Sequence, residues 1–159
     1  MIIRKFREGD TKPAALIVMN TFRKFNKTEC FQRSAVQRYL NRYDPQKNTQ
    51  QELLKSFKST PIFFVATEHG KIIGMIRGRP DRIINLFVDS KQHKRGIGRL
   101  LVERFEEEAG KQGSKLIRLR SSLYATGFYQ RMGYKKTTGI RKFHGLKVNP
   151  MRKIFLKTI

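Results

Sequence analysis

The chain has 159 residues and a formal net charge of +23, from 35 lysine and arginine residues against 12 acidic ones. Because 38% of its residues are hydrophobic, with twelve phenylalanines and five tyrosines, it has enough apolar material for a core, which excludes a disordered basic tail. Its one cysteine, Cys30, excludes an internal disulfide framework and a cysteine-based zinc site, so no metal is expected. No apolar run approaches the ~20 residues that span a bilayer, and no signal-peptide core is seen. We therefore expect one cytoplasmic domain over residues 1–159, without membrane contact.

The positive charge is concentrated toward the C-terminus. Residues 109–159 hold thirteen of the basic residues and none of the acidic ones. Such a bias is explained either by a solvated surface or by a field that recruits an anion, such as a cofactor, an acidic substrate, a nucleic acid or a lipid headgroup. Composition alone leaves both interpretations open.

The first elements in chain order are a strand and a helix. Residues 2–7 have the composition of a short strand. Asp10 and Thr11 then provide a helix N-cap, and Pro13 falls in the first turn of a helix that runs to about Phe25.

Two more helices follow, before the hydrophobic period changes to that of strands. The helices are expected over residues 35–42, capped by Ser34, and over residues 50–58, capped by Asn48 or Thr49. Three strands of an antiparallel meander are then expected over residues 62–67, 71–77 and 82–88.

The C-terminal part alternates helices and strands. The expected elements are a helix from Gly96 to about Gly113, a strand over 116–120, a short helix over 125–132, and two final strands over 134–143 and 151–157. No linker or repeat interrupts this order, which predicts an α/β fold with a mixed sheet.

The turn between the third meander strand and the next helix is the most informative segment. Gly96 and Gly98 remove side chains where the backbone approaches a ligand, and the first N–H groups of a helix have no partner within it. Such a helix start binds phosphate. Its basic residues are Lys91, Lys94, Arg95 and Arg99. A dinucleotide-binding fingerprint and a P-loop are both disfavoured by the residues that follow, but an ordinary glycine turn stays open.

Two motifs resemble the GNAT superfamily of N-acetyltransferases. Residues 86–101 (LFVDSKQHKRGIGRLL) resemble its acetyl-CoA signature, with His93 in place of the usual Gln or Arg. Residues 122–134 (SLYATGFYQRMGY) resemble a second motif of the family, with Ser122 replacing Asn and Tyr134 replacing Phe. The order of elements matches the family along essentially the whole chain.

The resemblance implies a mixed, mostly antiparallel central sheet, flanked by helices and splayed open at the cofactor site. Backbone N–H groups of residues 94–99 would hold the pyrophosphate of acetyl-CoA, and the main chain of residues 86–88 would bind its pantetheine arm. The cofactor contacts that the resemblance implies are Leu86, Phe87, Val88, His93, Lys94, Arg95, Gly96, Ile97, Gly98, Arg99, Ser122 and Ala125.

The resemblance also implies direct attack of an amine on the thioester. The N–H of Val88 would stabilise the oxyanion, and Tyr129 would protonate the leaving thiolate; the alternative is that Tyr129 is only a packed aromatic. No general base is evident, and a water chain or a lowered pKa of the amine could replace one. The candidate bases are Asp81, Glu68, His69 and His144.

The acceptor side is expected to be basic, which favours an amine that carries a carboxylate or phosphate, or a basic protein carried on RNA. The acceptor is thus a small-molecule or protein amine, and the oligomeric state stays open. The alternative is a nucleic-acid- or ribosome-associated module on the same scaffold. The basic residues expected on the acceptor side are Arg77, Arg79, Arg82, Arg141, Lys142, His144, Lys147, Arg152 and Lys153.

Overall fold

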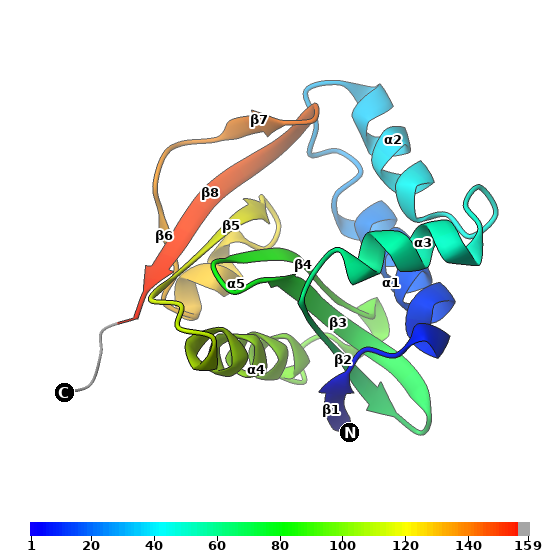
Figure 1. The fold of residues 1–159 in the computed structure, drawn as a ribbon. Helices are drawn as coiled ribbons and strands as arrows, with labels where there is room; N and C mark the ends of the chain where they lie inside the picture. Colours follow the sequence, from blue (N-terminus) through cyan, green and yellow to red (C-terminus); the bar gives the residue numbers. More distant parts are fainter. Residues whose placement is uncertain (156–159) are drawn as a thin grey trace.

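The computed structural model describes residues 1–155. Eight strands form one open, mostly antiparallel sheet in the order β1-β2-β3-β4-β5-β8-β6, with β7 pairing with β8. Helices α1–α3 gather over one face near β1–β4, and α4 lies against the other face (Figure 1). The elements are β1 Ile2–Lys5, α1 Thr11–Phe25, α2 Arg33–Tyr43, α3 Gln50–Lys58, β2 Ile62–Glu68, β3 Lys71–Arg79, β4 Arg82–Val88, α4 Ile97–Lys111, β5 Leu116–Ser122, α5 Thr126–Arg131, β6 Lys135–Lys136, β7 Arg141–Phe143 and β8 Leu146–Ile154.

The sheet separates two apolar layers. Strand β3 is covered on both faces, so consecutive residues are buried: Met75 packs with α1–α3, and Ile76 packs with α4. Leu101 and Phe105 of α4 are fully buried in the second layer. Within residues 1–155, no helix is both long and apolar enough to cross a bilayer.

The starts of α2 and α3 test two predicted caps. Thr49 Oγ1 accepts a hydrogen bond from Glu52 N at 3.1 Å, so the prediction that Thr49 caps α3 is confirmed. The prediction that Ser34 caps α2 is wrong, because the helix already begins at Arg33 and Ser34 Oγ accepts a hydrogen bond from Arg38.

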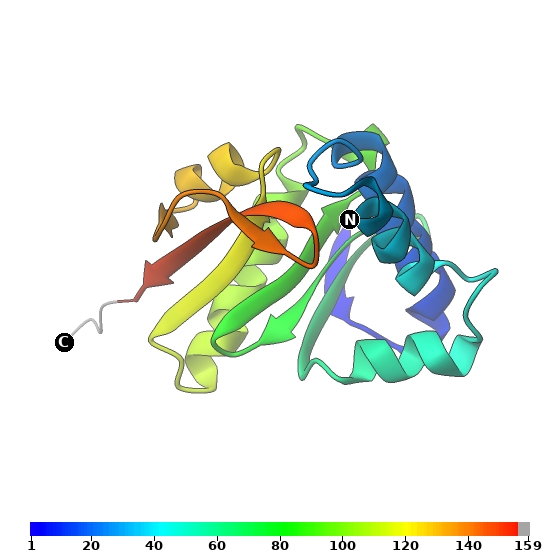
Figure 2. The ribbon, with the colours of Figure 1, turned by 90° about the horizontal axis from the view of Figure 1, so that it is seen from above.

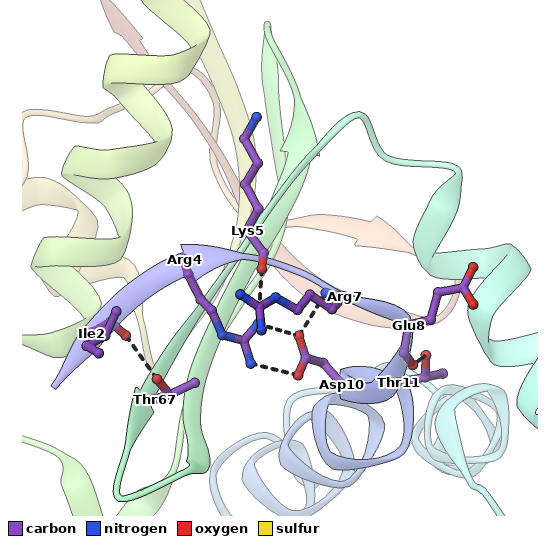
Figure 3. A network of polar contacts seen from close by, with 8 residues as sticks. All are labelled: Ile2, Arg4, Lys5, Arg7, Glu8, Asp10, Thr11 and Thr67. Carbon is purple, nitrogen blue, oxygen red and sulfur yellow. Dashed lines mark hydrogen bonds and ion pairs between the residues drawn. The ribbon is translucent and has the colours of Figure 1, made fainter.

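At the start of α1 the carboxylate of Asp10 forms an ion pair instead of the predicted cap (Figure 3). It lies 2.7 Å from Arg4 Nη1 and accepts a hydrogen bond from Arg7 N at 2.8 Å. Burial raises the pKa of Asp10, but the hydrogen bonds from Arg4 and from the Arg7 backbone outweigh it, and the net pKa is lowered. The carboxylate therefore ties β1 to the start of α1.

Strands β4 and β5 are parallel neighbours that separate after a short contact. Arg82 pairs with Arg118, and the Arg118 N–H donates to the Asp81 carbonyl at 2.9 Å. Close to this contact β4 has a bulge, because Arg77 pairs with Asn85 and Gly78 with Ile83, which leaves Ile84 without a partner in β3. A Cβ on Gly78 would lie 2.0 Å from the Arg82 carbonyl oxygen, so this position admits only glycine. The predicted splayed, mostly antiparallel sheet is thereby confirmed.

The two predicted final strands are three in the structure. Residues 134–143 hold the separate strands β6 and β7, and β8 begins at Leu146 rather than at residue 151. His144 and Gly145 have φ values of 51° and 81°, which form the turn into β8. Pro150 disfavours a strand by sequence, yet in the structure it pairs with Arg120, and its carbonyl oxygen accepts a hydrogen bond from Thr137 N at 3.0 Å. Residues 156–157 of the predicted strand lie outside the described residues.

Candidate active site

A cavity of about 760 Å³ opens between β4 and β5, beside the N-terminus of α4. It lies where the two strands have separated, so main-chain groups of both strands border it. All of the residues predicted to contact the cofactor line it, except Arg95. They are Leu86, Phe87, Val88, His93, Lys94, Gly96, Ile97, Gly98, Arg99, Ser122 and Ala125.

The segment before α4 has the backbone shape of an anion-binding concavity. Lys94 and Gly96 both adopt the left-handed region, with φ values of 67° and 77°. A non-glycine residue in this region is strained, and such strain is concentrated at ligand-binding segments. Alternation of backbone handedness turns successive N–H groups toward one point, next to the free N–H groups of the first turn of α4.

The first turn of α4 packs against β4 and α5. A Cβ on Gly98 would lie 3.4 Å from Phe128 Cζ and 3.8 Å from Val88 Cγ2, which are ordinary van der Waals distances. A side chain would therefore fit at this position, but it would cover backbone that glycine leaves uncovered beside the cavity.

Two of the four basic residues at this turn are neutralised by carboxylates. Arg95 turns away from the cavity and forms an ion pair with Glu68 at 2.8 Å, which lowers the pKa of Glu68 to about 2 through the hydrogen bond. Arg99 pairs with Glu103 at 2.8 Å one helical turn later. The sequence analysis considered Glu68 only as a candidate base and missed its pairing with Arg95, because the fold alone brings the end of β2 to this turn. Lys94 lines the cavity, and Lys24 and Arg131, which the sequence analysis did not single out, add to its positive charge.

Three aromatic rings from distant segments stack at the cavity wall. Phe25, at the end of α1, lies between His93 and Tyr124, with ring centroids 4.9 Å and 4.5 Å away. His93 Nε2 lies 2.9 Å from the Val88 carbonyl oxygen and therefore donates to it. The stack bridges α1, the β4–α4 segment and the β5–α5 segment. No local sequence signal indicates it.

Glu29 holds the segment that carries Tyr124 in place through hydrogen bonds. Its carboxylate accepts hydrogen bonds from Leu123 N at 2.8 Å, Tyr124 N at 2.9 Å and Asn26 Nδ2 at 3.2 Å. These bonds join the segment after α1 to the turn between β5 and α5. The sequence analysis did not single out Glu29, since an isolated glutamate in a loop carries no signal of this kind.

The main chain of Val88 faces the opening between the strands. Asp89 N donates to Ile73 O of β3, and N–H groups of neighbouring residues in a strand point to opposite edges. The N–H of Val88 therefore lies on the edge toward β5, where the sheet is open.

Tyr129 lies on α5 next to Phe128, which lines the cavity, but Tyr129 itself does not line it. Only 6% of its surface is exposed, and its ring packs against Phe128 and Tyr134. Burial raises its pKa well above the usual range. No hydrogen bond joins its hydroxyl to another residue within 1–155.

None of the four candidate bases lines the cavity. Glu68 is held by Arg95, and Asp81 lies in the β3–β4 turn. His69 and His144 occupy the β2–β3 and β7–β8 turns, where both have positive φ.

Two basic residues expected on the acceptor surface are held elsewhere. Arg77 is buried and donates to Asn85 Oδ1 at 2.6 Å and to the Tyr43 hydroxyl at 3.1 Å, which fixes the bulged part of β4 to α2. Lys153 projects toward α4 and pairs with Glu106 at 3.1 Å. Side-chain alternation along the strands decides these positions, and the sequence analysis had the wrong face or depth for both.

Comparison with known proteins agrees with this geometry. A family model described as acetyltransferase (GNAT) domain matches residues 25–155. Human N-acetyltransferase 8 is 32% identical over 54% of this chain, and the match spans only 44% of that protein. A GCN5-related N-acetyltransferase from Rhodopseudomonas palustris has a TM-score of 0.81 at 18% identity, covering 97% of this chain and 95% of that one. The PaiA N-acetyltransferase from Thermoplasma acidophilum, solved with coenzyme A, has a TM-score of 0.73 at 19% identity, covering 97% and 98%. The structures share the fold, and because the family model covers most of the chain, the chain belongs to the GNAT acetyltransferase family.

Proposed function

We propose that the protein transfers the acetyl group of acetyl-CoA to a primary amine. One observation carries the proposal: the left-handed turn at Lys94 and Gly96 and the bare first turn of α4 border a cavity that lies between two separated strands. Its volume of about 760 Å³ suits a ligand of cofactor size. The residues present therefore fit coenzyme A.

The proposed binding mode uses mainly the backbone. The N–H groups of residues 94–99 would hold the pyrophosphate, and Lys94 would add positive charge. The open edge of residues 86–88 would bind the pantetheine arm through main-chain hydrogen bonds. Bound acetyl-CoA would supply an acetyl group activated as a thioester.

Two groups of this chain would serve the reaction itself. The N–H of Val88 would stabilise negative charge on the carbonyl oxygen, because it points into the opening. Tyr129 would give its proton to the departing sulfur. Burial raises the pKa of Tyr129, which keeps the phenol protonated but also makes it a weaker acid, so proton transfer would require its hydroxyl to reach the cavity that its neighbour Phe128 lines.

The incoming amine must be neutral to attack. No carboxylate among the described residues lines the cavity, so we propose that the positive surroundings favour the neutral amine. The names of two relatives, human N-acetyltransferase 8 and an aminoglycoside 6'-acetyltransferase type Ii, are consistent with an amine acceptor.

A direct test combines thermal unfolding with a thiol-release assay. Acetyl-CoA at a hundred times its Kd should stabilise the fold by about 2.7 kcal/mol, and thiol release should depend on an added amine. Failure of millimolar acetyl-CoA to raise the melting temperature would refute the proposal and favour a binding module. CoA without its acetyl group is the control, since it should stabilise the protein without releasing further thiol.

A further inference from the structure

Five basic residues lie side by side across five neighbouring strands, and we call them the basic row. The strand registers pair Arg79 with Arg82, Arg82 with Arg118, Arg118 with Arg152, and Arg152 with Lys135. Residues directly opposite each other in a sheet project from the same face, so the five side chains share one face.

The basic row lies on the face opposite α4. Ile117 and Leu119, which flank Arg118, are buried in the layer beneath α4, and so is Met151 beside Arg152. Arg118 and Arg152 therefore project from the other face, and both are exposed. Figure 2 shows α1–α3 gathered over the strands on the right, with β5 and β8 extending beyond them on the left.

The basic row lacks neutralising partners within residues 1–155, where none of its members forms an ion pair with a carboxylate. Burial lowers the pKa of Arg82, and the charges of Arg120, Arg118 and Arg79 lower it further, against an opposing effect of Asp81. Like charges on directly opposite residues destabilise a sheet. A bound anion would remove this destabilisation.

The basic row is connected to the cofactor cavity along β5. Residues 118, 120 and 122 lie on the same face by alternation, and Ser122 lines the cavity. Arg120 stands between them, with its guanidinium 4.1 Å from the centre of the Phe143 ring. At ~3.3 Å per residue, Arg118 lies about 13 Å along the strand from Ser122.

We propose that the basic row binds the anionic groups of the acceptor. The acceptor would carry two or more phosphate or carboxylate groups about 13 Å from its reacting amine. Guanidinium groups bind both kinds of anion through paired hydrogen bonds, and strands ~4.8 Å apart give the row a length of about 19 Å. The acetylation step rests on the proposed function, whereas anion binding does not.

An acidic peptide or protein is favoured over a nucleic acid as the acceptor that occupies the basic row. Single-stranded nucleic-acid sites interleave basic residues with aromatic platforms for the bases, whereas five consecutive strands pair only basic residues in the row, and the Phe143 ring nearby is covered by the Arg120 guanidinium. Arg118 also shares a sheet face with Ser122, which lines the cavity, so an anion bound at the row would limit where an attached amine can lie.

Anion binding is tested first, with inorganic tripolyphosphate as the probe and saturating CoA to occupy the cofactor turn. Calorimetry should show about tenfold weaker binding in Arg118→Gln/Arg152→Gln than in the wild type. The control is Lys12→Gln/Lys71→Gln, which removes the same charge from two exposed residues outside the row. Equal binding by the row variant, or equal weakening in the control, overturns the proposal.

Acceptor selection is tested with two peptides, Gly-Gly-Gly-Gly-Glu-Glu-Glu and the same peptide ending in three glutamines. Four extended glycines span about 13 Å, so the glutamates would reach the row. The wild type should prefer the glutamate peptide about tenfold in kcat/KM, the row variant should lose this preference, and Lys12→Gln/Lys71→Gln should keep it. A preference that is absent, or that survives in the row variant, overturns the proposal.

A competition experiment with tripolyphosphate distinguishes a nucleic-acid site from an acidic-peptide site. If a single-stranded RNA displaces tripolyphosphate in a row-dependent way and the glutamate peptide does not, the row is a nucleic-acid site and the proposal fails. If no acceptor releases thiol, the proposed function fails instead. Displacement of tripolyphosphate by the glutamate peptide then still decides whether the row binds an anionic peptide.

Discussion

Tyr129 and Asp10 show how surroundings set the chemistry of a single side chain. Both are almost fully buried, with 6% and 8% of their surfaces exposed, yet their pKa values move in opposite directions. Tyr129 has only burial acting on it, so its pKa rises. Asp10 accepts hydrogen bonds from Arg4 and Arg7 N, which overcome burial and lower its pKa.

Replacing Tyr129 by Phe tests its proposed role as proton donor. We expect kcat to fall about a hundredfold, because general acids contribute 10²–10⁴-fold, while the KM for acetyl-CoA stays unchanged. Because burial raises the pKa of Tyr129, the wild type should show no alkaline loss of kcat from this group up to pH 10. Steady-state kinetics across pH 7–10 with a good acceptor give the comparison, and an unchanged kcat in the variant would assign Tyr129 to packing alone.

Replacing Asp10 by Asn tests the ion pair with Arg4. Since the folded-state pKa of Asp10 is lowered, its charge stabilises the fold above the unfolded pKa of ~3.9, and this stability is lost as the pH falls through the folded value. The free energy of unfolding at pH 7 should drop by about 2 kcal/mol, with the difference shrinking below pH 4. Denaturant unfolding at several pH values measures this.

Glu8→Gln is the matched control, because it removes a carboxylate whose ion pair with Lys58 is exposed. Its effect should stay below about 1 kcal/mol at every pH. Equal effects of the two substitutions would mean that Asp10 is no more than a surface charge.

Helix α4 has a glycine at each end, and the surroundings of the two glycines differ. Gly98 lies in the first turn and borders the cavity, whereas Gly110 lies in the last turn, where an added Cβ would meet no atom within 4 Å. Alanine favours a helix over glycine by up to about 1 kcal/mol at either place. Only at Gly98 does the added methyl group face Phe128 and the cavity.

Alanine substitutions at both positions test the proposed phosphate-binding turn. Gly98→Ala should raise the KM for acetyl-CoA about tenfold, because its methyl group covers backbone that the phosphates would approach. Gly110→Ala should leave that KM unchanged and raise the melting temperature. Unchanged cofactor affinity in Gly98→Ala would contradict the assignment of this helix start to the pyrophosphate.

The whole molecule carries a net charge of +23, so its folded state is under electrostatic self-repulsion. The repulsion is strongest where like charges are adjacent, as in the basic row. The Debye length is ~10 Å at 0.1 M salt, which exceeds the ~4.8 Å between strands. Adjacent members of the row therefore still repel one another at this concentration, and added salt weakens the repulsion by shortening the Debye length.

Thermal unfolding in sodium chloride tests this view of the charge. Between 20 and 200 mM salt we expect the wild-type melting temperature to rise by several degrees, on the order of 1 kcal/mol of stability. Arg118→Gln/Arg152→Gln should respond less steeply than Lys12→Gln/Lys71→Gln, although both have the same net charge. Equal slopes would show that the total charge, not its arrangement in the basic row, sets the response.

The sequence by itself determined most of the elements and the glycine turn before α4. Pro13 marks the first turn of α1, the hydrophobic period gives α3, alternation gives the meander, and Gly96 with Gly98 marks the start of α4, because these signals depend on neighbouring residues alone. Local signals failed where a side chain on another element competed for a group, as when Arg4 of β1 bonded the carboxylate of Asp10 in place of the cap.

Only the tertiary structure decided which distant residues meet. It brought Glu68 to Arg95, placed Phe25 between His93 and Tyr124, and buried Arg77 away from the acceptor face. It also aligned the basic row, because strand register depends on pairing between segments far apart in the sequence. The sequence therefore determines the number of charges, whereas the order and register of the strands determine which charged side chains lie next to one another.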